Sequence, residues 1–326
     1  MPEEILPNLF RIRVPLIGNP LRELNSYLIR GDGRNLLIDT GFRQDPCRQA
    51  LLAGLKDLGV RREDTDILLT HLHSDHSGLG PEFVGEGREI YIGERDLPWM
   101  CSDTRNELWK HSDIAYRLAG FPVTILFEAD RSNPARSMAP APDFTRYHPI
   151  KNGEVLQVGG YRLKAVLTPG HTPGHLCFWL EEQGVMFTGD HVLFDITPNI
   201  TAWMGVPDSL GDYLASLRAI SRFDVKLTLP AHRESGELKP RIESLLRHHE
   251  IRLNEALSVV KNNPGFTAVE IGGKMTWKIH ADSWETFPLT QKWFAVGECM
   301  SHLDHLIALG KVRREVSGEV YRYYAV

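Results

Sequence analysis

The chain has 326 residues, of which 42% are hydrophobic and 24% are charged, and its formal net charge is -5. This is the composition of an ordinary globular protein with room for one large domain and a smaller one. The charge gives no electrostatic reason to expect nucleic acid or an anionic membrane surface as a partner. No apolar run approaches the roughly 20 residues of a membrane span.

The first residues of the chain and its cysteines indicate the cellular compartment in which the protein is expected. Residues 1–4, Met-Pro-Glu-Glu, lack the basic and apolar regions of a signal peptide. The four cysteines are isolated, with no Cys-x-x-Cys pair: Cys47, Cys101, Cys177 and Cys299. They are typical of reduced thiols rather than of a disulfide framework. We therefore expect a cytoplasmic protein.

Short apolar runs separated by turn residues fill the first hundred positions. These runs predict strands at residues 10–17, 26–29, 36–39, 67–69 and 89–92. A helix is predicted from Asp45 and Pro46 to about Leu58, where Gly59 ends it.

Three histidines and one aspartate directly follow the predicted strand 67–69. His71 and His73 form a His-x-His pair that can aim two imidazoles at one point, while Asp75 and His76 can face a second. Neutral imidazole and carboxylate suit transition metals such as zinc or iron. The alternative is a polar loop whose histidines cluster by chance. Four adjacent polar side chains of this kind would not improve the packing of the protein, which disfavours this alternative.

The pattern changes over residues 94–152. Aromatic residues occur there at irregular spacing, and a run rich in proline and alanine covers about 134–142: the aromatic residues are Trp99, Trp109, Tyr116, Phe121 and Phe127. We interpret this segment as a partly helical insertion. It is either a lid over a site or a surface excursion packed for stability alone.

Strands resume after the insertion and suggest a layered α/β fold. Strands are predicted at 155–156, 161–167, 176–180, 185–187 and 226–229, with an amphipathic helix over 210–223. Two sets of hairpins, each followed by helices and strands, indicate two packed sheets with helices outside. We therefore predict a four-layered αββα sandwich over residues 1–235.

Residues 236–326 are predicted to form a small winged-helix-like domain. Helices over 241–260 and 291–309 precede a hairpin of strands 311–316 and 319–323. Acidic residues roughly balance the basic ones: among them are Glu243, Glu250, Glu255, Glu270, Asp282 and Glu285. Because nucleic-acid affinity depends mainly on neutralising phosphates, a docking or homodimerisation role is favoured.

Further histidines and an aspartate follow other predicted strands. His171 and His175 come after 161–167, Asp190 and His191 after 185–187, and His232 after 226–229. Glycine and proline at these turns let the backbone bend sharply and hold ligands rigidly.

This combination resembles the metallo-β-lactamase superfamily of metal-dependent hydrolases over about residues 9–235. The resemblance rests on His-x-His-x-Asp-His, a later isolated histidine, Gly-Asp and a final histidine, in that order. It implies that His71, His73 and His171 hold a first metal ion. Asp75, His76 and His232 would hold a second, and Asp190 would bridge both.

The sequence resembles some branches of this superfamily more than others. Hydroxyacylglutathione hydrolases share the seven ligands, but their glutathione-binding tail is not recognisable here. True β-lactamases of this superfamily are secreted and generally lack the bridging aspartate, so Asp190 argues against antibiotic hydrolysis. The nucleic-acid-cleaving branch usually carries a large inserted domain, for which 94–152 is too short.

The remaining histidines divide into three groups. His175 is expected to orient a ligand by a hydrogen bond, the alternative being a solvent-facing side chain. For His191 we predict proton donation or substrate contact, with simple packing as the alternative. His302 and His305 copy a metal motif on a predicted helix and are expected to be surface charge. His248, His249, His111, His148 and His280 belong to no constellation.

The chemistry implied is hydrolysis by a hydroxide held between two metal ions. Asp75 and Asp190 would fix the nucleophile, which attacks a carbonyl or phosphoryl centre. A thiolate, with a pKa near 8.5, leaves without a proton, whereas an alkoxide needs an acid such as His191 or His175. We therefore favour a small acyl substrate, a thioester or an activated ester or lactone, over a phosphodiester.

Two other functions compete with this prediction. One is a metal-dependent nuclease, with the winged helix feeding RNA or DNA to the same metals. The other is a non-enzymatic binding scaffold, which seven intact ligand positions disfavour. Zinc is the first expectation for both ions, although iron and manganese fit similar ligands.

Overall fold

The structure is a computed structural model. It describes the whole chain except residues 123, 125, 127–136, 141–143, 145, 279, 280 and 282, and the side chains of 102 and 103. Phe127, His280, Asp282 and most of the run 134–142 therefore lie outside the described residues.

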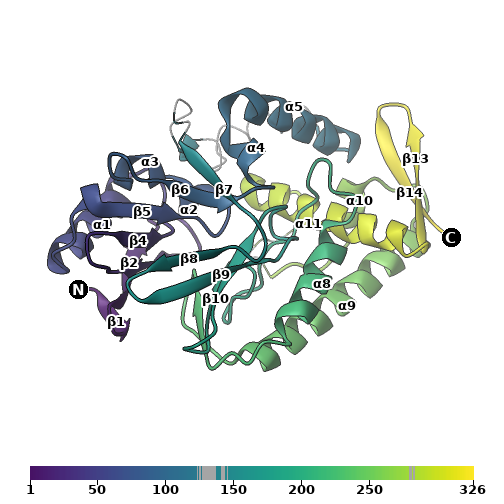
Figure 1. The fold of residues 1–326 in the computed structure, drawn as a ribbon. Helices are drawn as coiled ribbons and strands as arrows, with labels where there is room; N and C mark the ends of the chain where they lie inside the picture. The colour runs from purple at the N-terminus through teal and green to yellow at the C-terminus, as the bar shows by residue number, and fades with distance from the viewer. Residues whose placement is uncertain are drawn as a thin grey trace.

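Seven strands in chain order form the first sheet (Figure 1). They are β1 (Glu3–Leu6), β2 (Leu9–Pro15), β3 (Glu23–Ile29), β4 (Asn35–Ile38), β5 (Thr65–Leu68), β6 (Ile90–Gly93) and β7 (Tyr147–Ile150). Strands β1 to β4 pair antiparallel, and β4 to β7 pair parallel. Carboxyl ends of the parallel strands therefore meet at one edge.

Five strands form the second sheet, in the order β12-β11-β10-β9-β8. They are β8 (Val155–Val158), β9 (Tyr161–Leu167), β10 (Leu176–Leu180), β11 (Val185–Gly189) and β12 (Leu227–Pro230). Only β11 and β12 pair parallel, so both sheets are mixed.

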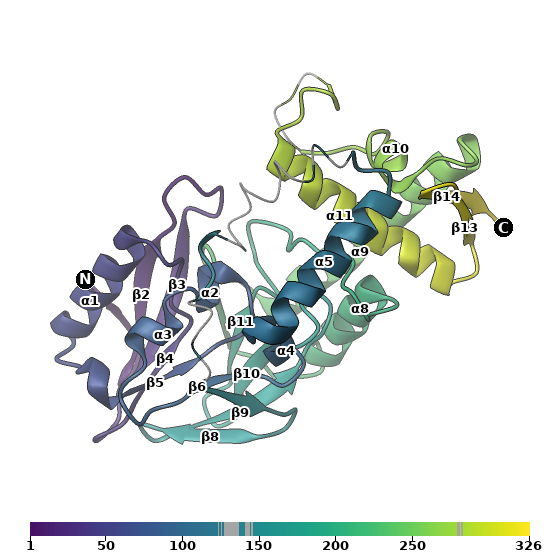
Figure 2. The ribbon, with the colours of Figure 1, turned by 90° about the horizontal axis from the view of Figure 1, so that it is seen from above.

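Helices cover the outer faces of both sheets (Figure 2). Helices α1 (Asp45–Asp57) and α3 (Gly80–Phe83), with the 3-10 turn η1 (Arg62–Asp64) beside them, lie over the first sheet, and α8 (Ser209–Ile220) lies over the second. Side chains alternate between faces: Ile67 of β5 points to α1, and its neighbour Leu68 points to Phe178 and Phe187 between the sheets. The predicted αββα architecture is confirmed.

The predicted insertion 94–152 is partly wrong, because β7 lies within it and extends the first sheet. Only Ile150 of this strand is buried, and Pro149 lacks a backbone donor, so the hydrophobic signal of a strand is weak. Helices α4 (Leu97–Met100) and α5 (Ser102–Leu118) lie in the part of this segment that the structure describes. All four cysteines are free, as predicted.

The C-terminal part contains the predicted helices and hairpin. Its elements are α9 (Leu238–Asn262), α10 (Ala268–Gly272), α11 (Leu289–Ala308), β13 (Val312–Ser317) and β14 (Val320–Ala325). Helix α5 shares their core, since the Tyr116 ring stacks on Trp293 with centroids 4.7 Å apart. The division of the chain after residue 235 stays a prediction.

The surface position expected for His302 is wrong. Its ring is fully buried, donates from Nδ1 to the Glu298 carbonyl at 2.7 Å, and faces His249 at 3.4 Å. The helical period explains this, because Cys299 and Leu306 lie three residues before and four after His302, on the same buried stripe. His305 is also mostly buried and pairs with Asp208 at 2.8 Å.

In the part of the chain that the structure describes, no helix is both long and apolar enough to cross a bilayer.

Burial of His302 makes stability depend on pH. It lowers the pKa of the ring to about 3, whereas an unfolded histidine titrates near about 6.5. The unfolded chain alone takes up the proton below about pH 6.5, so stability present above that pH is lost progressively toward pH 3, at up to about 1.4 kcal/mol per pH unit. His302→Gln should make the loss of unfolding free energy between about pH 6.5 and 4.5 shallower, as measured by urea titration.

The control is His111→Gln on the exposed side of α5. It should keep the wild-type dependence of unfolding free energy on pH. An equally steep dependence for His302→Gln would contradict this account.

Candidate metal centre

The predicted ligand residues come from four strand ends. His71 and His73 follow β5, His171 lies between β9 and β10, Asp190 follows β11, and His232 follows β12. Because β11 and β12 are parallel neighbours, their carboxyl ends lie side by side at the same edge. The loop after β5 continues into the short helix α2 (Ser74–Ser77), which carries Asp75 and His76.

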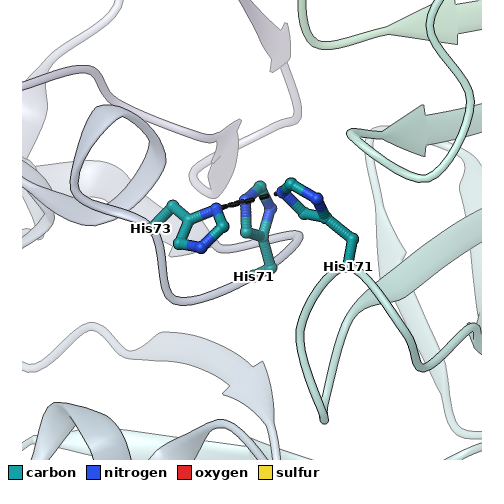
Figure 3. Close-up of side chains that lie close together, drawn as sticks. All are labelled: His71, His73 and His171. Atoms are coloured by element: carbon teal, nitrogen blue, oxygen red, sulfur yellow. Dashed lines mark hydrogen bonds between the residues drawn. The ribbon is translucent and has the colours of Figure 1, made fainter. Parts of the chain in front are cut away.

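His71, His73 and His171, here called the first triad, turn three ring nitrogens toward one point (Figure 3). Nδ1 of His73 lies 2.9 Å from Nε2 of His71 and 3.0 Å from Nε2 of His171. The His-x-His pair therefore aims two imidazoles at one point, as its spacing predicts. The third nitrogen belongs to His171, in the loop between β9 and β10 of the second sheet.

Asp75, His76 and His232, here called the second triad, gather beside the first. Oδ2 of Asp75 lies 3.3 Å from Nε2 of His232 and 3.7 Å from Nε2 of His76. All three residues are buried.

Asp190 lies between the two triads. Its Oδ2 is 3.5 Å from Nε2 of His171, whereas its Oδ1 is 3.4 Å from Nε2 of His232 and 3.6 Å from Nε2 of His76. One carboxylate thus faces both groups with different oxygens. The structure brings all seven predicted residues together.

Hydrogen bonds on the far side of the rings fix the tautomers. Nδ1 of His171 lies 2.8 Å from the Asn199 carbonyl, and Nδ1 of His232 lies 2.7 Å from the Glu23 carbonyl. A carbonyl oxygen only accepts, so both Nδ1 atoms must donate. The Nε2 atoms of the neutral rings then present lone pairs to the centre, as metal ligands do.

The donor set fits metal cations. Nε2 of His76, Nε2 of His232 and Oδ1 of Asp190 are buried and find no hydrogen-bond partner among the described residues. Burial alone would lower the pKa values of His76 and His232, but the adjacent carboxylates raise both. The buried carboxylates of Asp75 and Asp190 therefore favour positive charge between the two triads, and two divalent ions would supply it.

Asp39 supports the second triad, a role that our sequence analysis missed. Its carboxylate accepts from the Thr70 backbone N–H at 2.9 Å and from Nδ1 of His76 at 2.8 Å. It follows β4, the parallel neighbour of β5, so the strand-end pattern used for the other ligands could have found it. Its φ of 59° lies in the left-handed region, which aspartate tolerates.

Asp96 joins the two loops that carry the first triad, and it too was missed. Its buried carboxylate accepts from the Leu72 N–H at 3.1 Å, the Thr172 hydroxyl at 2.7 Å and the Gly174 N–H at 2.5 Å. Burial raises the pKa of Asp96 to about 7, although these donors oppose the shift. Its sequence context carried no signal, since its partners are distant in the chain.

His175 and His191 lie behind the centre. Nε2 of His175 accepts a hydrogen bond from the Asp190 backbone N–H at 3.2 Å, so its proton is on Nδ1, beside the Thr168 hydroxyl. The His191 ring packs between those of His175 and Tyr213, and burial lowers its pKa to about 3. This favours packing over proton donation for His191, and its catalytic role stays a prediction.

Two glycines allow the close approaches that the centre needs. Gly170 has a φ of 135°, and a Cβ there would lie 2.4 Å from Cβ of Tyr213. A Cβ on Gly189 would lie 2.6 Å from Nε2 of His175. Glycine at these two strand ends, where sharp turns were expected, is therefore also a steric requirement.

Tryptophans form an apolar wall beside the first triad. The Trp203 ring stacks on His73 with centroids 5.9 Å apart, and Trp99 meets Trp203 edge-on at 4.9 Å. Trp203 Nε1 also donates to the His171 carbonyl at 3.0 Å. A substrate at the first triad would therefore meet aromatic surface.

Comparison with protein families now identifies the class. Residues 20–232 match the Metallo-beta-lactamase superfamily, and because this is more than half of the chain, the protein belongs to that superfamily. With its two groups of histidine and aspartate ligands, it is a hydrolase of that superfamily.

Two solved structures resemble the chain over its whole length. The metallo-beta-lactamase family protein TTHA1429 from Thermus thermophilus is 30% identical, with a TM-score of 0.79 over 99% of this chain and 100% of that one. A beta-lactamase domain protein from Burkholderia ambifaria is 25% identical, with a TM-score of 0.83 over 100% of this chain and 94% of that one.

Curated relatives carry the name lactamase-like protein nscB. The relative from Aspergillus fumigatus is 26% identical over 86% of this chain and 82% of its own length. The relative from Neosartorya fischeri is 28% identical over 74% of this chain, but the match spans only 60% of that protein.

Asp96 should affect metal affinity through the two loops it joins. In Asp96→Asn the amide group would face N–H donors in place of an acceptor oxygen. Loss of such a supporting partner costs about 10- to 100-fold in metal affinity. We expect a loss of this size for zinc, measured by competition with a chromophoric chelator.

Asp66→Asn is the matched control for this substitution. Asp66 is also buried and hydrogen-bonded, but it lies near the start of β5, while the centre follows the end of that strand. It should lose stability and keep its zinc affinity. Equal zinc affinities for Asp96→Asn and the wild type would refute the role assigned to Asp96.

Proposed function

We propose that the protein is a dinuclear metal-dependent hydrolase of small acyl substrates, namely thioesters, esters or lactones. The observation that carries the proposal is the position of Asp190, whose two oxygens face separate triads. The first triad would hold one ion, the second triad the other, and Asp190 would bridge them. Zinc is the first candidate for both ions, with iron or manganese as alternatives.

Bound divalent ions would polarise the substrate oxygen and lower the pKa of water to about 7. The chain itself supplies charge and rigidity around them. Histidine rings adjacent to Asp75 and Asp190 lower the pKa values of both carboxylates against the effect of burial, so both are anionic. They offset the charge of the ions and define where a nucleophile can lie.

The need of the leaving group for a proton is the argument for an acyl substrate. His175 accepts at Nε2 and directs its proton to Thr168, so it has no proton for a substrate. Burial leaves little imidazolium on His191. With neither of these two histidines as an acid, the site suits leaving groups that depart as anions, such as a thiolate with a pKa near 8.5.

The aromatic wall supports an apolar acyl group. Trp203 lies against His73 of the first triad and Trp99 packs against Trp203, so an acyl chain can bury apolar surface there. Their rings offer little to a phosphodiester, whose anionic oxygens need cationic partners.

The C-terminal part is proposed to be a winged-helix-like module with a docking or homodimerisation role. Among its described residues are the helices α9, α10 and α11, followed by the hairpin of β13 and β14. Arg313 and Arg314 of the hairpin lie over the rings of Tyr324 and Tyr321 and pair with Glu315 and Asp304, so these cations are already engaged. That arrangement favours protein contacts over phosphate binding.

A substrate panel tests the proposed reaction. Acyl-CoA thioesters, lactones, phosphodiesters and RNA are offered to protein of measured metal content. We expect turnover of thioesters or lactones that a chelator abolishes and added metal restores. Cleavage of RNA alone would favour the nuclease, and activity that survives complete metal removal would contradict both.

Asp190→Asn tests the bridging role. The amide keeps the shape of the side chain but loses the negative charge between the triads. Ion-assisted charge stabilisation amounts to several kcal/mol, so kcat should fall by at least about 100-fold. Asp57→Asn on the exposed side of α1 is the control. Near-wild-type kcat for Asp190→Asn in the panel assay would exclude the bridge.

A further inference from the structure

We propose that helix α11 completes the first triad, with Glu298 as a positioning residue that acts on His171 through Asn199. This inference rests on the proposed metal centre and adds the C-terminal helices to it. It assigns these helices a role in metal binding, beside any role in docking.

One short segment, residues 199–203, holds His171 from two sides. The Asn199 carbonyl accepts from Nδ1 of the His171 ring at 2.8 Å. The Trp203 indole donates to the His171 backbone carbonyl at 3.0 Å. Ring orientation and main-chain position of this ligand therefore both depend on where the segment lies.

The segment has no regular secondary structure and is held by α11. The Ser301 hydroxyl donates to the Ile200 carbonyl at 2.6 Å, and the Ala202 N–H donates to the Gly297 carbonyl at 3.3 Å. Gly297 is required for this approach, because a Cβ there would lie 2.3 Å from the Thr201 hydroxyl oxygen. Backbone and side-chain contacts thus fix the segment to one face of the helix.

Glu298 makes the side-chain contact that reaches the partner of His171. Its Oε2 accepts from the Asn199 amide at 3.4 Å, and its Oε1 lies 3.4 Å from Nε of Arg252. Arg252 is held in turn by the Trp277 ring, 4.4 Å away, and by the Thr276 carbonyl. Burial raises the pKa of Glu298, and the Arg252 guanidinium opposes that shift. The carboxylate is therefore anchored at both oxygens.

The first triad is the one that needs this support. Asp96 fixes the loop of His71 and His73 and also the backbone just after His171. The His171 ring itself is oriented by the Asn199 carbonyl. Removal of the Glu298 carboxylate would leave the Asn199 amide without this acceptor and free its carbonyl to move. Because such outer partners orient metal-bound histidines, the first triad should lose affinity while the second keeps it.

Metal titration of the full-length chain tests the inference. Glu298→Ala, Glu298→Gln and Asn199→Ala are freed of metal and titrated with Co²⁺, with d–d absorption and chelator competition as readouts. We expect wild type to bind two ions. In Glu298→Ala one of the two sites should weaken about 10- to 100-fold, with an altered spectrum. Glu298→Gln, which keeps an acceptor for Asn199, should recover most of the affinity.

Glu255→Ala is the matched control. Glu255 pairs with the same Arg252 and accepts from the Thr276 N–H, but its contacts lie on the C-terminal side alone. It should bind both ions as wild type does. If Glu298→Ala fails to fold, Asn199→Ala decides, because it breaks the same side-chain link but retains the backbone carbonyl that accepts from His171.

Three outcomes would overturn the inference. Wild-type affinity at both sites in Glu298→Ala or in Asn199→Ala is one, and equal weakening of both sites is the second. Equal losses in Glu255→Ala and Glu298→Ala are the third, since they would mark a general effect on stability. A wild-type chain that binds no ion would contradict the proposed metal centre itself, which separates that failure from these.

Discussion

Buried acceptor atoms that face one another set the constraint on which the rest of the structure depends. Nε2 of His76 and Nε2 of His232, two buried rings, point at the carboxylate oxygens of Asp75 and Asp190. Lone pairs and negative charges placed in this way repel unless positive charge lies between them. The cations that would remove this repulsion would also activate the water for hydrolysis. The same donor atoms therefore matter both for the stability of the fold and for catalysis.

The fold meets this constraint by fixing several of these residues from outside. Asp39 sets the tautomer of His76 from the first sheet, and Asp96 joins the two loops of the first triad. Backbone carbonyls perform the same task for His171 and His232. Since the ligands come from both sheets, their mutual geometry depends on how the sheets pack, and the segment 199–203 extends that dependence to α11.

The strands and the histidines and aspartates at their ends could be found because their signals are local, and the resemblance to the superfamily implied how seven of these residues divide between two ions. A histidine or aspartate directly after an apolar run needs no knowledge of its partners. Strand β7 was not predicted because Ile150 is its only buried residue and Pro149 interrupts the pattern. His302 was misjudged although the helical spacing of Cys299 and Leu306 marks its stripe as buried. The role of Asn199 is performed by a carbonyl that every residue has, so it depends on a tertiary contact, which a single sequence does not display.

Anomalous X-ray diffraction from zinc-loaded crystals of the full-length protein tests the central claim most directly. Two peaks should lie on opposite sides of the Asp190 carboxylate, one among the ring nitrogens of the first triad and one among the donor atoms of the second. Peaks elsewhere, or no peak between the triads at saturating zinc, would contradict the two-ion centre.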